Sequence, residues 1–71
     1  MTFGERLRSA REKAEFTQNQ LAEGAGITQG QVSAWERDRL TPVADERLVR
    51  LAQALGVSLD WLIGGDEENA S

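Results

Sequence analysis

The chain has 71 residues, with 12 acidic and eight basic side chains, and neither cysteine nor histidine. Its length allows one small domain, and the missing residue types exclude disulfides, zinc fingers, thiol nucleophiles and imidazole bases. We therefore expect no cofactor, no metal and no enzymatic activity. No apolar run reaches the roughly 18 residues of a membrane span, and the N-terminus lacks a signal-peptide core. A cytoplasmic location is expected.

The first predicted helix spans residues 3 to about 14. Thr2 and Glu5 form a capping-box pattern before it, and apolar residues follow at helical spacing. Arg11 lies four residues after Leu7, beside this apolar stripe. Because an unpaired charge there would cost several kcal/mol, we expect Arg11 to find a carboxylate.

The segment from 17 to 38, TQNQLAEGAGITQGQVSAWERD, is predicted to form two short helices joined by a glycine turn. Each helix starts with a capping box, at Thr17 and at Thr28. Gly24 and Gly26 tolerate the left-handed conformation that ends a helix. Two helices of this length with a short glycine-containing turn match the helix-turn-helix motif. Glu36 lies beside the inward stripe of the second helix and is the expected partner of Arg11.

The second half of the chain predicts two more helices. Pro42 marks a turn or a helix start. Asp45 is the expected N-cap of a fourth helix, which ends at Gly56. Arg47 and Arg50 are interpreted as an exposed face of that helix.

A short fifth helix is expected after its cap, Ser58, and it stops at Gly64 and Gly65. The pattern predicts an all-α fold of five helices over residues 1–64. Trp35 is expected in the core, and Trp61 in the core or at a seam between two copies.

The predicted motif resembles the helix-turn-helix of lambda-type phage repressors, Cro proteins and their bacterial relatives, the XRE type. The matching positions are Leu21, Ala22, Ala25, Gly26, Ile27, Val32 and Trp35. The resemblance continues through WERD and LAQALGVSLDWLIGGD and covers residues 2 to 65. It implies a compact five-helix lambda-repressor-like domain and an Arg11–Glu36 ion pair inside it. It also implies a sequence-specific, DNA-binding transcriptional regulator of repressor type.

Candidate base-contacting residues lie at the start of the second motif helix, whose N-terminal residues reach base edges in a helix-turn-helix. Gln29 is the strongest candidate, because its amide can form two hydrogen bonds with adenine. The family pattern implies groove contacts at Gln29, Gly30 and Ala34. Gly30 and Ala34 offer no donor but permit close approach, and Ser33 is either solvated or in contact with a base.

Phosphate contacts are expected at the N-terminus of the first motif helix, where free amides favour an anion. Gln18 occupies the position where the resemblance implies a phosphate-binding glutamine. Arg37, Arg39 and Arg8 are further candidates, and Arg11 can also touch phosphate. Such contacts fix the register of the protein on DNA.

Useful specificity requires two copies on a palindromic operator, because one helix reads few base pairs. The resemblance implies a homodimer formed by the C-terminal helices. We expect the contact at Leu59, Trp61 and Leu62, and double-stranded DNA as the partner.

The formal net charge of −4 is opposite to the usual charge of a DNA-binding protein. Residues 1–40 are balanced, so the whole excess lies in residues 41–71. Residues 65–71 are interpreted as an acidic flexible tail, or as the start of a linker to a C-terminal dimerisation or sensor domain. The alternative function is a protein-interaction module, an antirepressor or adaptor, on the same fold with a weakened DNA face.

Overall fold

A computed structural model describes residues 1–65, so the predicted acidic tail lies outside the described residues from Asp66 onward. The helices are α1 (Phe3–Lys13), α2 (Gln18–Ala25), α3 (Gln29–Glu36), α4 (Glu46–Leu55) and α5 (Leu59–Gly64). Residues 1–65 contain no strand. The predicted all-α fold of five helices is confirmed.

The helix starts follow the predicted capping residues. Thr2, Thr17 and Thr28 each form a complete capping box with the side chain three residues later. The Asp45 carboxylate accepts from two backbone N–H groups of α4, and the Ser58 hydroxyl accepts from Trp61 N. Since α4 begins only at Glu46, Pro42 lies in the loop that precedes it. Local hydrogen bonds therefore fix where each helix begins.

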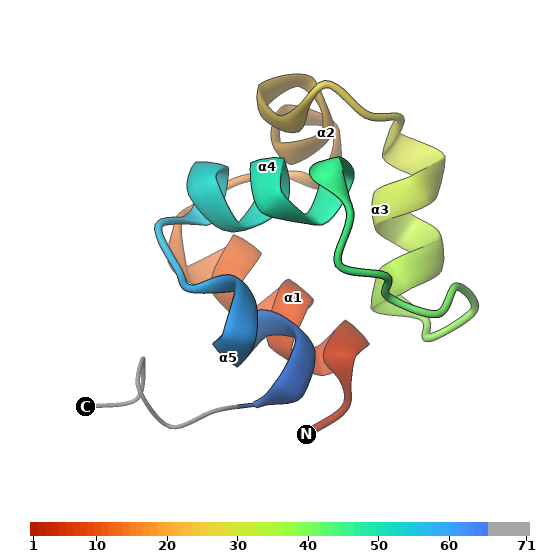
Figure 1. Cartoon of the computed structure of the whole chain (residues 1–71). Coiled ribbons are helices and arrows are strands. Elements are labelled where there is room, and N and C mark those ends of the chain that lie inside the picture. Colours follow the sequence, from red (N-terminus) through yellow and green to blue (C-terminus); the bar gives the residue numbers. More distant parts are fainter. Residues whose placement is uncertain (66–71) are drawn as a thin grey trace.

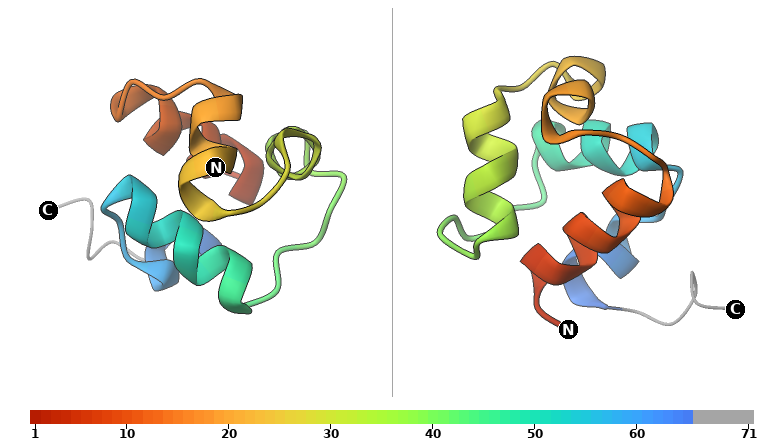
Figure 2. Two further views of the ribbon diagram at one scale, coloured as in Figure 1. Left: turned by 90° about the horizontal axis from the view of Figure 1, so that it is seen from above. Right: turned by 180° about the vertical axis from the view of Figure 1, so that it is seen from behind.

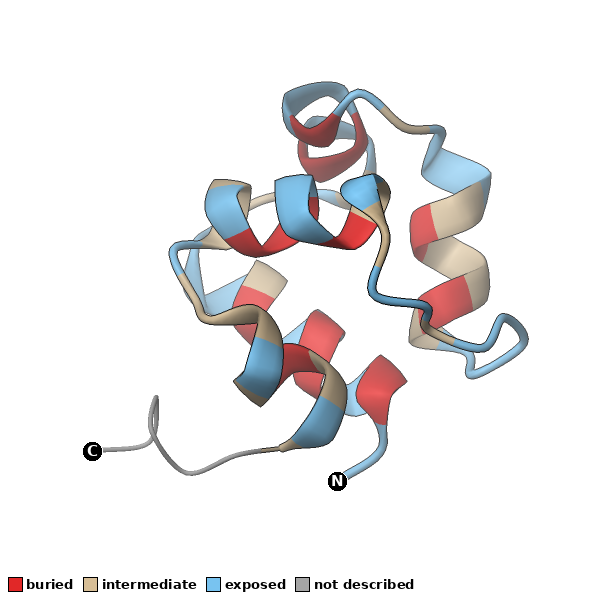
Figure 3. Ribbon diagram, viewed as in Figure 1, coloured by how far each residue is buried: buried red, intermediate tan, exposed pale blue. Residues whose placement is uncertain are grey.

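The helices enclose one core (Figure 1). α1 packs against α3 and α5, α2 packs against α3 and α4, and α4 packs against α5. Figure 2 shows α3 and α5 on opposite sides of this arrangement. The buried residues of each helix lie on its inward side (Figure 3).

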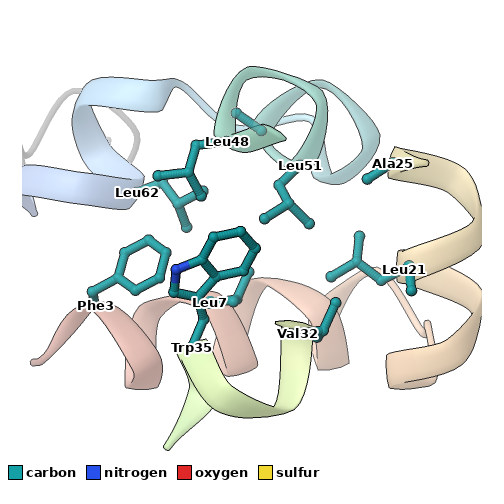
Figure 4. Close-up of a cluster of buried hydrophobic side chains, with 11 residues drawn as sticks. Phe3, Leu7, Leu21, Ala25, Val32, Trp35, Leu48, Leu51 and Leu62 are labelled. Carbon is teal, nitrogen blue, oxygen red and sulfur yellow. The ribbon is translucent and has the colours of Figure 1, made fainter. Parts of the chain in front are cut away.

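Trp35 occupies the centre of the core and is 1% exposed, as predicted. Its ring lies among Phe3, Leu7, Leu48 and Leu62 (Figure 4). Phe3 meets it edge-on, with 6.4 Å between ring centroids and an interplanar angle of 78°, an arrangement that aromatic pairs favour. Because Trp35 belongs to α3, the core directly determines where that helix lies.

Within residues 1–65, no helix has both the length and the apolar composition needed to cross a membrane.

Candidate nucleic-acid interface

The α2 and α3 helices form a helix-turn-helix. The turn runs from Gly26 to Thr28. Gly26 has a φ of +70°, so its left-handed conformation ends α2. Ile27 N then donates to Ala22 O over 3.0 Å, and the Thr28 hydroxyl starts α3. The turn is therefore held by backbone hydrogen bonds and by the cap of the second helix.

A buried ion pair joins α1 to α3, as the sequence predicted. Arg11 Nε donates to Glu36 Oε2 over 2.6 Å, and Arg11 Nη2 donates to Glu36 Oε1 over 3.2 Å. The side chains are only 12% and 5% exposed. The hydrogen bonds to Glu36 raise the pKa of Arg11 above its ordinary value, although burial opposes this shift. Arg11 Nη1 also donates to Phe16 O over 2.8 Å, so the pair anchors the start of the motif as well.

Glu36 also binds Gln18 directly, and through Gln18 it is connected to Gln29, the two glutamines predicted to contact DNA. Gln18 Nε2 donates to Glu36 Oε1 over 3.1 Å, and Gln29 Nε2 donates to Gln18 Oε1 over 2.7 Å. We call Arg11, Glu36, Gln18 and Gln29 the Glu36 network. It runs from the buried ion pair to the exposed amide of Gln29. The first residues of both motif helices are therefore connected through their side chains.

The other predicted base-contacting residues lie on α3 with different exposure. Gly30 is exposed like Gln29, whereas Ser33 and Ala34 are half-buried. A methyl group added at Gly30 would meet no atom closer than Thr28 Oγ1, at 3.9 Å. The face of α3 that carries these residues therefore presents one long amide beside small residues.

The predicted phosphate-contacting arginines are all exposed or near the surface. Arg8 forms an ion pair with Glu12 on α1, and both side chains are more than half exposed. Arg37 caps the C-terminus of α3, and Arg39 follows in the loop. Neither Arg37 nor Arg39 forms an ion pair within residues 1–65. Their charges are thus available to an external anion.

The C-terminus of α3 is tied to the N-terminus of α1 by Asp38, which the sequence did not single out. Its Oδ1 accepts from Gly4 N over 2.9 Å, and its Oδ2 accepts from Thr2 Oγ1 over 2.8 Å. Asp38 adopts a φ of +57° in doing so. A methyl group at Gly4 would lie 2.5 Å from Glu36 O and 2.6 Å from Trp35 O. Only glycine permits this close approach of the two helices.

The interpretation of Arg47 as part of an exposed face is correct only in part, because its side chain is 42% exposed but also contacts the core. Its guanidinium lies over the Trp35 ring, 5.3 Å from the centroid. It also donates to Asp45 Oδ2 from Nε and Nη2, over 3.1 and 2.8 Å. These hydrogen bonds are the main reason that the pKa of Asp45 is lowered and that of Arg47 is raised. Arg47 is drawn inward because a guanidinium is attracted to the face of a tryptophan ring. Arg50 has a similarly exposed side chain and pairs with Glu46, but it lies over no aromatic ring of residues 1–65.

One predicted dimer residue must be corrected. Leu62 is 0% exposed in the single chain, where it fills the core, so it has no surface to offer a second copy. Leu59 and Trp61 are half-buried and pack against the core on one side. Trp61 also lines a groove between α1 and the turn that joins α4 to α5. Trp61 thus packs partly on the core and keeps an exposed side, so both locations considered for it, the core and a seam between two copies, apply in part.

Arg6 is a buried charge that the sequence analysis missed. It is 9% exposed and donates to backbone carbonyls at the end of α5. The signal was available, since Arg6 lies three residues after Phe3 and four before Ala10, both of which are buried. The spacing argument that identified Arg11 applies equally to this position.

Among residues 1–65, no group of three or more carboxylate, histidine or cysteine side chains converges to form a metal site.

Comparisons with known proteins place this geometry in a family. The helix-turn-helix family model matches residues 7–62. The HTH-type transcriptional regulator ImmR of Bacillus subtilis is 42% identical over 67 residues, which cover 94% of this chain and 52% of ImmR. Repressor protein C2 of Salmonella phage P22 is 38% identical over 64 residues, which cover 90% of this chain and 29% of C2. The chain thus spans about half the length of these curated relatives, or less.

Solved structures agree with the sequence comparisons. The P22 c2 repressor, in complex with a synthetic operator, matches with a TM-score of 0.86 and 36% identity over 93% of this chain and 98% of that one. SinR of Bacillus subtilis, in complex with DNA, matches with a TM-score of 0.80 and 28% identity over 86% and 97% of the two chains. The fold is that of lambda-type and P22 repressor domains. With a family match over most of its length, this chain belongs to the XRE-type helix-turn-helix family of DNA-binding domains, whose members include phage and Bacillus repressors.

Proposed function

We propose that residues 1–64 are the operator-binding domain of a repressor-type transcriptional regulator that binds a palindromic site as two copies. The observation that carries the proposal is the Glu36 network, which holds the Gln29 amide at the exposed start of α3. In this reading α3 enters the major groove with its N-terminal residues against base edges. The DNA complexes of the P22 c2 repressor and SinR support the assignment.

The charge on Glu36 determines which base Gln29 can read. A carboxylate paired with arginine can only accept, so Gln18 must turn its Nε2 toward Glu36 and its Oε1 toward Gln29. Gln29 must then donate one Nε2 hydrogen to Gln18. Its second Nε2 hydrogen and its Oε1 remain, which together match N7 and N6 of adenine. Guanine presents two acceptors and would leave Oε1 unpaired, so we infer adenine at this position.

The small residues of α3 supplement this single polar contact. Gly30 and Ala34 allow the helix to lie close to the floor of the groove, and the Ala34 methyl can pack against a thymine methyl. Ser33 is half-buried and reaches at most one base edge. Direct readout then depends mainly on Gln29, and each half-site carries little sequence information.

Phosphate contacts would position the domain on the duplex. Thr17 Oγ1 accepts from Gln20 N, which leaves the first two N–H groups of α2 for an external acceptor, and the helix dipole favours an anion there. Gln18 has one Nε2 hydrogen beyond the one that it gives to Glu36. Arg37 and Arg39 add positive charge at the other end of α3, and Arg8 adds it on α1. The balanced charge of residues 1–40 limits non-specific affinity for DNA, which makes pairing of two copies necessary.

The pairing surface that we propose is centred on α5. With Leu62 buried in the core, Leu59 and Trp61 are the expected dimer contacts that keep some exposed surface. Leu59 also lines a mainly apolar depression together with Ala44, Ile63, Gly64 and one charged residue, Asp60. Val43, next to it in the α3–α4 loop, is 56% exposed. A second copy would cover this apolar surface while placing the two α3 helices in half-sites about 34 Å apart.

The proposal is tested by selecting binding sites from random duplex DNA with the purified protein and titrating the winner across a salt series. We expect an enriched palindrome and an affinity that falls steeply with salt. Gln29→Ala should lose discrimination at one adenine position per half-site, by about 1 to 3 kcal/mol, or roughly 5- to 150-fold. Gln53→Ala, which removes an exposed amide from α4, should leave the selected sequence unchanged.

Gln18→Ala separates the network from a simple phosphate contact. If Gln18 orients Gln29, its removal should relax the preference at the same adenine position in addition to weakening binding overall. An enriched site that Gln18→Ala binds more weakly but reads identically would contradict the orienting role. Failure to enrich any sequence at low salt would overturn the DNA-binding proposal itself.

A protein-interaction module on the same fold is the second candidate. The excess of acidic residues favours it, as do Gly30 and Ala34, which offer no donor to a base. The exposed apolar Leu40, in the loop after α3, would suit a protein partner as well. The two functions differ in their dependence on Gln29, because an antirepressor or adaptor would retain its activity in Gln29→Ala.

A further inference from the structure

Arg6 is 9% exposed, and apart from the Arg11–Glu36 pair it is the most deeply buried charged residue among residues 1–65. Its guanidinium donates from Nε to Leu62 O over 3.0 Å and from Nη2 to Ile63 O over 2.6 Å. Nη1 donates to Met1 O over 2.7 Å. No carboxylate of the described residues lies within ion-pair distance of it. Because all of its acceptors are backbone carbonyls, the buried guanidinium fixes the position of the backbone segments that carry them.

Two of these three carbonyls, those of Leu62 and Ile63, belong to the last turn of α5. The final four carbonyls of a helix have no intrahelical donor, and Arg6 satisfies two of them while its charge complements the negative end of the helix dipole. Gly65 N satisfies another, that of Trp61, over 2.8 Å. A six-residue helix has little stability of its own. The position of α5 therefore depends on Leu62 in the core and on Arg6 at its end.

The chain after α5 also passes close to Arg6. Gly65 has a φ of +69°, and a methyl group there would lie 3.0 Å from Arg6 Nη1. The left-handed turn thus brings the backbone close to the guanidinium, where a Cβ would make a tight contact and the positive φ would strain it. Arg6 therefore connects α1 both to the last turn of α5 and to the turn at Gly65 that follows it.

We propose that Arg6 is a positioning residue for pairing of two copies, because it fixes the surface of α5 relative to α3, the helix proposed to enter the major groove. This inference rests on the proposed function, in which α5 carries the pairing surface. The α1 helix that bears Arg6 is the same helix that Asp38 and Gly4 tie to the end of α3. Arg6 therefore connects the element that contacts the other copy to the element that contacts DNA. With Arg6 removed, α5 loses its fixed orientation, and two α3 helices no longer meet their half-sites together.

The test compares wild type, Arg6→Met, Arg6→Lys and Arg50→Met. Methionine keeps the length and apolar stem of Arg6 but removes its charge and its donors. Arg50→Met makes the same change at an exposed arginine of α4. Each protein is titrated with the selected palindrome and with a duplex in which one half-site is scrambled. Hydrogen exchange of the α5 amides is measured without DNA.

For Arg6→Met we expect affinity for the palindrome to fall about tenfold more than affinity for the single half-site, within the range typical of coupling between two sites. The α5 amides should exchange faster, while those of α2 and α3 change little. Arg6→Lys should give an intermediate ratio, because one ammonium can reach only part of the carbonyl set. Arg50→Met should match wild type. If Arg6→Met does not fold, Arg6→Lys carries the same comparison.

Equal losses on the palindrome and the half-site would overturn the proposal, as would unchanged exchange in α5. If the wild type selects no duplex, the proposed DNA-binding function fails separately. Sedimentation equilibrium at high protein concentration then tests pairing alone. A lower association constant for Arg6→Met than for Arg50→Met would support the role of Arg6, and equal constants would overturn it.

Discussion

The close approach of α1 and α3 at Gly4 predicts that a single methyl group destabilises the domain. A Cβ at Gly4 would lie 2.5 Å from Glu36 O, whereas ordinary contact begins at 3.4 Å. The backbones would have to separate by about 0.9 Å, and overpacking of this kind costs about 1 to 3 kcal/mol. The separation would also strain the hydrogen bond from Gly4 N to Asp38. The higher helix propensity of alanine offsets at most about 1 kcal/mol of this loss in the free energy of unfolding. We expect Gly4→Ala to lower the free energy of unfolding by about 1 to 3 kcal/mol.

Gly24→Ala is the matched control, because a Cβ at Gly24, also in a helix, meets nothing within 4 Å. It should raise the free energy of unfolding by about 0.5 to 1 kcal/mol. Urea unfolding followed by the fluorescence of Trp35 and Trp61 measures both variants. Each kcal/mol should move Tm by about 4 to 8 °C for a domain of this size. Equal effects of the two substitutions would refute the close approach, since propensity alone treats them alike.

Three further predictions concern the ion pairs around α3. Arg11→Met should lower the free energy of unfolding by about 3 to 5 kcal/mol, because it leaves the Glu36 carboxylate buried without its partner. Urea unfolding should show that the double variant Arg11→Met/Glu36→Leu recovers part of this loss. Asp45 has a lowered pKa, so its stabilisation is present above the unfolded value of about 3.9 and is lost as pH falls through the folded value. The Tm difference between wild type and Asp45→Asn should therefore shrink in acid, and a constant difference would contradict this. Arg47→Met should shift Trp35 emission and lower Tm, whereas an unchanged spectrum would mean that the cation does not lie over the ring.

The sequence predicted most of the fold because its signals are local. Capping boxes at Thr2, Thr17 and Thr28 join residues three apart, so their hydrogen bonds do not depend on the rest of the chain. Periodicity then identified the inward faces. The Arg11–Glu36 pair followed from both charges lying beside those faces. The caps and the inward faces need only the geometry of a single helix, and the ion pair needs only that two such faces share one core.

The missed features are those that depend on how helices meet. Gly4 and Asp38 lie 34 residues apart, and no local pattern reveals that their backbones approach. Arg6 lies at an inward spacing, but its partners are backbone carbonyls. Every residue has such a carbonyl, so residue types do not show which ones Arg6 contacts. Leu62 was assigned to a surface because its helix was expected there, although the core takes the one apolar position of α5 that points fully inward.

The fixed position of α3 compensates for its sparse chemistry. The helix carries one long polar reader, Gln29, and small residues beside it, so an error in its placement cannot be offset by other contacts. Three separate attachments hold it: Glu36 to Arg11, Asp38 to the start of α1, and Trp35 under Arg47. Each attachment joins α3 to a different point on α1 or α4, which removes rotation as well as translation. If this rigidity supports readout, Gly4→Ala should reduce discrimination at the Gln29 position even under conditions where the variant remains fully folded. Discrimination equal to that of Gly24→Ala would mean that the groove itself, and not the scaffold, aligns the helix.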